Sequence, residues 1–198
     1  MSNYTFFGVQ TAYRQYRGDL SRSQLHGVIS RGTQEQSLPE KRGFWKRIVG
    51  IVGDHVPHFE YGSWDLIRGD KAEAEFESWS SEIEGGIATE AEEMGAKVDE
   101  ASRLSTQISD TRLVVVSALF LVDAGSNSDD TLGERCDLPE AGYFKRTTFD
   151  RLWKTIPLLN FANVRADAVY VVPGNERDGL AELEIREHWS HLKPVERD

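Results

Sequence analysis

The clearest hydrophobic pattern lies in the last third of the chain, where two apolar runs flank an amphipathic segment. Residues 113–122 are apolar at almost every position, and residues 166–172 form a second such run. A run without alternation predicts a strand that is covered on both faces. Between the runs, residues 147–156 have apolar side chains at helical spacing behind a threonine that can cap a helix. The pattern predicts a strand–helix–strand unit, whose helix packs on the strands through Phe149, Leu152, Trp153 and Ile156.

Periodicity in the first half of the chain is mostly helical. Residues 4–29 have apolar spacings that fit one or two short helices, although alternation in residues 5–13 leaves a strand as an alternative. Residues 40–53 predict another helix, and residues 63–108 carry an apolar stripe at three- and four-residue steps. Two glycines, at positions 85 and 86, should break or kink this stripe. The stripe therefore predicts an acidic helical hairpin or one long kinked helix.

These patterns together predict an α+β fold with two regions. Residues 1–110 are expected to form a helical N-terminal half, and residues 111–198 a small C-terminal sheet built around the strand–helix–strand unit. The helical half should pack on the sheet through its narrow apolar stripe. No internal repeat is visible in the sequence.

The formal net charge of −10 is distributed unevenly along the chain. Residues 1–50 hold eight Lys or Arg against three acids, whereas residues 51–110 hold fifteen acids against four bases. The acidic total argues against binding along nucleic acid, because phosphate neutralisation supplies most of that affinity. The reversal of sign suggests that the basic segment docks on the acidic helix within the molecule, or that it binds an external anion. Internal docking is the simpler interpretation.

Cysteine content and hydropathy limit the compartment and the cofactors. Cys136 is the only cysteine, so the chain can form neither an internal disulfide nor a cysteine metal cluster. The first residues are polar, without a basic segment leading into an apolar one, and no stretch approaches the roughly 20 apolar residues of a spanning helix. We therefore expect a cytoplasmic protein without a transmembrane segment and without a cofactor.

Three short stretches of the C-terminal region carry a family resemblance. Residues 114–123 are similar to the family's hydrophobic strand of the type VVV-x-L-x-VA. Residues 178–183 look like the first half of its acidic D-x-L closing pattern, and residues 189–192 look like a degenerate form of the Y-P-x-L that ends this pattern. On these stretches, under half of the chain resembles the family known as domain of unknown function 1517. Residues 171–173 stand where that family has a tryptophan turn, and residues 126–143 look like an insertion. The resemblance implies an accessory or regulatory role and carries over no site residue.

The histidines are candidates for metal chemistry. Four of the five fall in two His-x-x-His pairs, His55 with His58 and His188 with His191. Two such pairs could complete a tetrahedral zinc shell. Neither pair resembles the His-Glu-x-x-His helix of metalloproteases, and Pro57 lies inside the first pair. Surface or packing roles are the simpler interpretation, and metal binding is the alternative.

A second candidate site is the segment of residues 41–52, which combines an apolar aromatic face with a cluster of basic residues near its start. Such a composition suits an interfacial helix on anionic lipid or a helix that docks in a partner's groove. The alternative is a core helix whose basic end meets the acidic segment. The candidate partner- or lipid-binding residues are Arg42, Phe44, Trp45, Lys46 and Arg47.

None of these signals selects a particular reaction. We expect a non-catalytic interaction or regulatory protein that works through exposed charged helices, with an unidentified protein partner and a homo-oligomer as a further candidate. One alternative is a small metal-dependent hydrolase that uses the two His-x-x-His pairs. Another is a peripheral protein that binds anionic membranes through residues 41–52.

Overall fold

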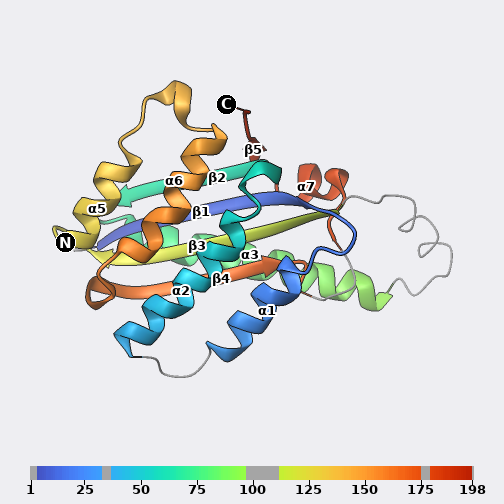
Figure 1. Ribbon diagram of the computed structural model, residues 1–198, viewed down its shortest axis with the longest axis horizontal. Helices are drawn as coiled ribbons and strands as arrows, with labels where there is room; N and C mark the ends of the chain where they lie inside the picture. Colours follow the sequence, from blue (N-terminus) through green and yellow to red (C-terminus); the bar gives the residue numbers. More distant parts are fainter. Residues whose placement is uncertain (1–3, 33–36, 97–111, 175–178, 198) are drawn as a thin grey trace.

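The computed structural model describes residues 4–32, 37–96, 112–174 and 179–197, and in these residues an antiparallel sheet is combined with helices (Figure 1). The strands are β1 (Tyr4–Gln15), β2 (Phe59–Arg68), β3 (Arg112–Asp123), β4 (Val164–Val172) and β5 (Lys193–Pro194). The α-helices are α1 (Ser21–Arg31), α2 (Leu38–Gly53), α3 (Ala72–Ala96), α5 (Asn127–Cys136), α6 (Arg146–Thr155) and α7 (Glu182–His188). Short 3-10 helices are η1 (Val56–His58), η2 (Glu140–Gly142), η3 (Ile156–Leu158) and η4 (Phe161–Asn163).

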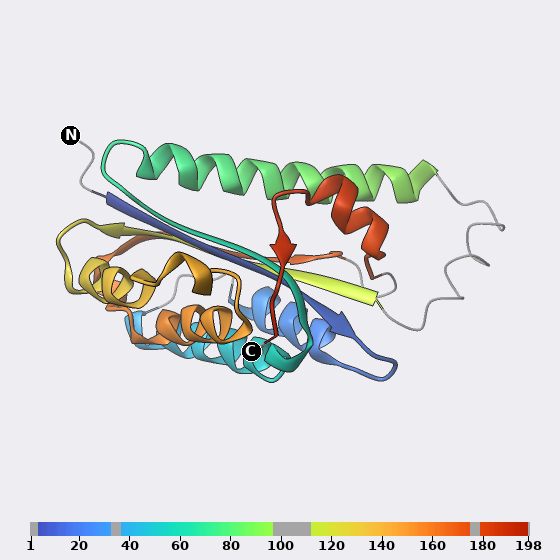
Figure 2. The same ribbon diagram turned by 90° about the horizontal axis from the view of Figure 1, so that it is seen from above.

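The sheet lies between two helical layers (Figure 2). Its strand order is β4-β3-β1-β2-β5, and all neighbouring strands are antiparallel. Helices α1, α2, α5 and α6 cover one face, called here the four-helix face, while α3 and α7 cover the other, called the α3 face. Phe7, Val9 and Tyr13 of β1 point to the four-helix face, whereas Phe6 and Ala12 point to the α3 face. The sheet therefore has a separate apolar core on each side.

The predicted arrangement, a helical N-terminal half on a small C-terminal sheet, is wrong. β1 begins at Tyr4 and pairs with β3 at the centre of the sheet, so the sheet runs across the boundary expected near residue 110. Residues 63–68, expected to start a helix, belong to β2, and the helix begins only at Ala72. The physical reason is that β1 is covered on both faces. Its apolar residues therefore occupy odd and even positions, and that spacing also fits a helix.

Polar residues inside β1 also obscured the strand, but each has a hydrogen-bond partner in the core. The Gln10 side-chain amide donates to Oγ of Ser117 on β3 over 3.0 Å. Oγ1 of Thr11 accepts a bond of 3.2 Å from the indole N–H of Trp153. A buried polar group that is hydrogen-bonded avoids most of the desolvation penalty, so these residues are compatible with a central strand.

The predicted strand–helix–strand unit of the C-terminal region agrees better with the structure than the predicted N-terminal half does. β3 and β4 confirm the two apolar strands, and α6 lies where the amphipathic helix was expected. The four apolar residues of that helix region, Phe149, Leu152, Trp153 and Ile156, are fully buried, which confirms that it is part of the core. The connection between the strands nevertheless contains a second helix, α5, which lies within the residues that look like an insertion relative to the family.

The two halves of the sheet share one order of elements. β1 is followed by α1 and α2 and then by its neighbour β2, and β3 is followed by α5 and α6 and then by its neighbour β4. β1 and β3 pair with each other at the centre, so β2 and β4 lie on either side of this pair. A β-α-α-β unit thus occurs twice in a chain whose sequence shows no repeat.

Candidate functional site

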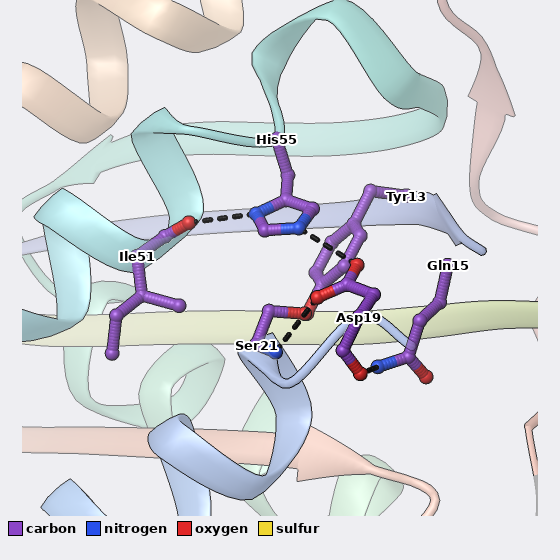
Figure 3. Close-up of polar contacts among 6 residues, drawn as sticks. All are labelled: Tyr13, Gln15, Asp19, Ser21, Ile51 and His55. Carbon is purple, nitrogen blue, oxygen red and sulfur yellow. Dashed lines mark hydrogen bonds and ion pairs between the residues drawn. The ribbon is translucent and has the colours of Figure 1, made fainter. Parts of the chain in front are cut away.

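A cluster of polar and aromatic side chains lies at the end of β1, where the chain turns into α1 (Figure 3). The hydroxyl of the fully buried Tyr13 lies 2.8 Å from Oγ of Ser21, the first residue of α1. Asp19, in the turn before α1, accepts a hydrogen bond of 2.8 Å from the Ser21 amide. Its other carboxylate oxygen lies 2.8 Å from Nε2 of His55, just beyond the end of α2. The cluster therefore joins β1, α1 and α2 at one end of the sheet.

His55 has the surroundings of a structural residue. Its Nδ1 lies 2.9 Å from the carbonyl oxygen of Ile51, which can only accept, so Nδ1 carries a hydrogen and donates. Nε2 faces the carboxylate of Asp19, and the ring lies against Tyr13 with 4.5 Å between the ring centroids. A general base needs a ring nitrogen that can take a proton from a substrate or a nucleophile. Both ring nitrogens of His55 are already occupied, so this cluster is a clamp between elements.

The neighbours of His55 are equally unsuited to nucleophilic chemistry. Burial raises the pKa of Tyr13, so its hydroxyl stays protonated and serves as a hydrogen-bonding group. Burial also acts to raise the pKa of Asp19, but the hydrogen bonds from Ser21 and the charge of His55 outweigh it, and the pKa lies below its usual value. Asp19 is therefore a carboxylate at neutral pH that strengthens the clamp.

The structure does not bring the two His-x-x-His pairs together. The ring centroids of His55 and His58 lie 6.5 Å apart, and His55 packs on Tyr13 at the four-helix face. His191 lies on the α3 face, and His188 is exposed at the end of α7. Across the described part of the chain, no group of three or more His, Cys, Asp or Glu side chains could hold a metal ion. A shared tetrahedral site thus has no geometric basis in this fold.

His191 instead ends a short chain of hydrogen bonds on the α3 face. Its Nε2 lies 2.7 Å from Oε1 of Gln10, and the Gln10 amide donates to Ser117. Nδ1 faces Glu82 of α3 at 3.6 Å, which is too long for a hydrogen bond. Burial lowers the pKa of His191, and the charge of Lys193 adds to this, while Glu82 opposes it. The ring is therefore placed as a neutral donor to Gln10.

Helix α2 turns its aromatic side toward the sheet. Trp45 is fully buried, and its indole N–H donates to Oδ2 of Asp167 on β4 over 2.8 Å. Phe44 is also buried, and the ammonium group of Lys41 pairs with the other oxygen of Asp167. These two aromatic residues pack in the core, as the core-helix interpretation expects. A lipid- or partner-binding role of Phe44 and Trp45 would need their release from it.

The outer side of α2 is basic. Arg42, Lys46 and Arg47 are exposed, and Arg42 makes one long contact of 3.4 Å to the carbonyl oxygen of Leu159. A docking role for residues 41–52 stays a prediction, and in this fold these three cations would make the contact.

The basic segment was expected to dock on the acidic helix, but its basic helix α2 does not do so. Helix α2 lies on the four-helix face and α3 lies on the opposite face, so the sheet separates the two charged helices (Figure 2). Arg14 of the basic segment pairs with Glu60 of β2 and Glu182 of α7, both at 3.0 Å. The distribution of charge along the sequence did not reveal this separation, because the separation depends on which face of the sheet each helix covers.

A second clamp, which the sequence patterns did not reveal, is built on Asp129 of α5. One carboxylate oxygen accepts hydrogen bonds from Thr5 of β1, at 3.0 Å, and from Arg68 of β2, at 2.8 Å. The other accepts from the Gly125 amide at 2.8 Å. Burial acts to raise the pKa of Asp129, but these bonds and the charge of Arg68 hold it below the usual value. The available signal was Ser126, three residues earlier, which caps α5 through the Asp129 amide.

The single cysteine, Cys136, is also unsuited to nucleophilic chemistry. It is buried at the end of α5, and burial raises the pKa of its thiol to about 12. A thiol with such a pKa is protonated at neutral pH, and the thiolate is the nucleophile in cysteine chemistry. Cys136 therefore acts as a packing residue in this fold.

Comparisons with family models, with curated proteins and with solved structures give no significant match to this chain. The arrangement of its own residues is thus the basis for any functional conclusion.

Proposed function

We propose that the protein is a non-catalytic interaction protein that binds an acidic protein surface through the outer side of α2. The observation that carries the proposal is the division of this helix into two sides. Phe44 and Trp45 anchor it on the sheet, and Arg42, Lys46 and Arg47 are exposed on the side that faces away. A rigid helix that presents several cations offers a preformed, electrostatically complementary surface to an acidic partner.

The groups that might otherwise support catalysis are engaged in structural contacts. His55 has both ring nitrogens against oxygen atoms, His191 is bonded to Gln10, and Cys136 has a strongly raised pKa. This arrangement favours a binding role over the alternative of a metal-dependent hydrolase. An accessory or regulatory role in the cytoplasm, which the family resemblance and the single cysteine suggest, belongs to the same proposal.

Arg42, Lys46 and Arg47 together are called here the basic face, and reversing their charges tests the proposal. The variant Arg42→Glu/Lys46→Glu/Arg47→Glu should lose the partner that co-purifies with the wild-type protein from its native host, because repulsion replaces attraction at the contact. The matched control, Arg135→Glu/Lys145→Glu/Arg186→Glu, changes three exposed cations elsewhere and has the same net charge. It should retain the partner. Equal recovery of the same partners with both variants would reject the basic face as the binding surface.

Vesicle flotation separates a protein partner from a membrane. Within the described residues, no helix is long and apolar enough to cross a bilayer. The aromatic side of α2 is buried, so this helix has little apolar surface to insert between lipids. The protein should therefore remain unbound with both neutral and anionic vesicles at about 0.1 M salt, where the Debye length is about 10 Å. Flotation with anionic vesicles that the basic-face reversal abolishes would favour the membrane alternative instead.

A further inference from the structure

Two helices of opposite charge face away from each other across the sheet (Figure 2). Arg42, Lys46 and Arg47 are exposed on α2, which carries one acid. Residues 72–96 contain eight Glu and no Lys or Arg, and Glu77 and Glu84 are among those exposed on α3. The sheet and both cores lie between these helices, so the exposed cations of α2 cannot pair with the carboxylates of α3 within one molecule. These two sets of charges can meet each other only between molecules.

Both helices have glycines at positions where a side chain would find room. A Cβ atom added at Gly43 or Gly50 of α2, or at Gly85 of α3, would meet nothing within 4 Å. None of these glycines has a positive φ, although glycine weakens a helix relative to alanine. Neither packing nor conformation within the molecule therefore requires glycine at these positions. Bare backbone beside charged residues permits the close approach of another helix.

We propose that α2 of one molecule docks on α3 of a second copy of the same chain. The argument for this occupant is charge complementarity: the chain itself supplies an exposed acidic helix to match its exposed basic helix. The inference rests on the interaction role proposed above, because it names a partner for the same side of α2. The contact joins different surfaces on the two molecules, so one copy keeps a free α3 and the other keeps a free α2. Such a heterologous contact adds further copies and does not stop at a dimer.

Ionic strength should affect this association in two opposite ways. Each molecule has a net charge of −10, so two copies repel one another over distances longer than a contact. At about 0.1 M salt the Debye length is about 10 Å, which screens much of this repulsion but leaves pairs in direct contact. At about 1 M salt the Debye length is about 3 Å, and the contact pairs are weakened as well. Association should therefore be strongest near 0.1 M and weaker at about 0.01 M and 1 M.

Sedimentation equilibrium of the full chain measures the association directly. Exposed ion pairs are individually weak, so the useful concentrations run from about 10 μM to about 1 mM. The weight-average mass should rise throughout this range without a plateau at the dimer. The variants Arg42→Glu/Arg47→Glu and Glu77→Lys/Glu84→Lys should each weaken association by at least about tenfold.

The acidic-helix variant is the more diagnostic of the two, because its net charge is smaller than that of the wild type. If only whole-molecule repulsion mattered, Glu77→Lys/Glu84→Lys would associate more strongly; docking on α3 predicts that it associates more weakly. Glu77→Lys alone, which leaves the 2.9 Å bond from the Tyr170 hydroxyl to Glu84 intact, should change association in the same direction. This single variant keeps the test valid if the double variant does not fold.

Combining the four substitutions in one chain supplies the decisive control. The combined variant has the net charge of the wild type, and its two helix surfaces are again complementary with their signs exchanged. Association should return to near the wild-type level. A mass that stays monomeric at all concentrations, a dimer plateau indifferent to the substitutions, or a combined variant as weak as either double variant would each overturn the proposal.

The outcomes also separate this proposal from the proposed function. If α2 binds an acidic partner but not a second copy, the wild type stays monomeric. The Glu77→Lys/Glu84→Lys variant then still captures the partner, and the basic-face reversal does not. If the basic face has no binding role at all, the basic-face reversal captures the same partners as its matched control.

Discussion

The two faces of the sheet are covered in different ways: aromatic packing dominates the four-helix face, whereas the α3 face includes a chain of polar contacts. On the four-helix face, large aromatic side chains such as Trp45, Trp153 and Phe120 are fully buried. On the α3 face, Trp79 is only partly buried, and the central positions of β1 and β3 hold Gln10 and Ser117.

Burial of apolar area is the main favourable term in folding, so the four-helix face should supply most of the stability. Its polar groups are tied down as well, since the indole N–H groups of Trp45 and Trp153 each donate to a side-chain oxygen. The α3 face instead places a titratable residue, His191, beside a buried amide. Near neutral pH, changes of pH should therefore act on the α3 face through His191, whereas at acidic pH they act on the four-helix face through Asp129. Cavities should be most costly on the four-helix face.

The largest expected effect is a cavity on the four-helix face. Trp153→Ala should lower the free energy of unfolding by about 3–5 kcal/mol, because it removes a fully buried ring and leaves the Thr11 hydroxyl without its donor. Trp79→Ala, at a partly buried site on the α3 face, should lower it by less than about 2 kcal/mol. Urea denaturation of both variants measures the contrast. Equal losses would show that the two faces contribute alike and would remove the basis of the comparison.

The Asp129 clamp at the end of the four-helix face should give the next largest effect. Asp129→Ala removes the acceptor for Thr5, Arg68 and Gly125 and should lower the free energy of unfolding by about 2–3 kcal/mol at neutral pH. The native pKa of Asp129 is lowered, so this contribution is complete above the unfolded pKa near 4 and is lost as pH falls through the native pKa.

The gap between wild type and Asp129→Ala should therefore narrow in acid, which urea denaturation at a series of pH values measures. Asp130→Ala is the matched control, because Asp130 is the exposed neighbour on the same helix. It should change stability by less than about 0.5 kcal/mol. A gap for Asp129→Ala that is constant with pH would mean that its charge contributes nothing to the clamp.

Much of the secondary structure could be predicted from the sequence, and the failures share a cause. β3, β4, α2 and α6 have a single dominant apolar pattern, and each was located within a few residues. β1 was expected only as the alternative to a helix, and β2 was missed, because their burial depends on which helices cover them, and local spacing carries no such information. The same limit hid the separation of the basic and acidic helices.

The candidate site was less predictable than the fold. His55 and His191 were recognised as unusual, but their partners Asp19 and Gln10 lie 36 and 181 residues away along the chain. Only the tertiary fold brings such residues together, and no spacing rule connects them. The pairing of Asp129 with Arg68, across 61 residues, was missed for the same reason.

A smaller effect concerns salt, which should not distinguish the two faces. Because the sheet separates α2 from α3, raising the salt concentration removes no ion pair between these two helices. The ion pairs that do hold α2, Lys41 with Asp167 and His55 with Asp19, are partly buried and are therefore screened little by salt. Their amide hydrogen exchange should shift by less than about 0.5 kcal/mol between 0.1 M and 1 M salt, in protein dilute enough to be monomeric. Exchange in these helices that accelerates with salt while that of β3 and β4 does not would revive the internal docking of the basic segment.

The smallest effect is the pH response of the α3 face, which isolates His191. Burial lowers the pKa of His191 in the folded chain. As pH falls, the residue is therefore protonated in the unfolded chain near the ordinary histidine pKa of about 6.5, while in the folded chain it is still neutral. The unfolded state then binds more protons, and the free energy of unfolding falls as pH drops from about 7 toward 5. The carboxylate of Glu82 and the ammonium group of Lys193 act on the ring from either side with opposite sign. The net response should therefore be modest.

Substitution of this residue by glutamine separates its response from the rest of the chain. His191→Gln keeps an N–H group that can donate to Gln10 and removes the titration, so its unfolding free energy should fall less over the same pH range. His188→Gln removes an exposed histidine from the nearby α7 and should follow the wild type. Denaturant unfolding at pH 7, 6 and 5, within the range that spans the usual pKa of histidine, measures all three proteins. If the His191→Gln protein and the wild type lose stability equally, burial does not hold the ring neutral, and His191 gives the α3 face no pH response between pH 7 and 5.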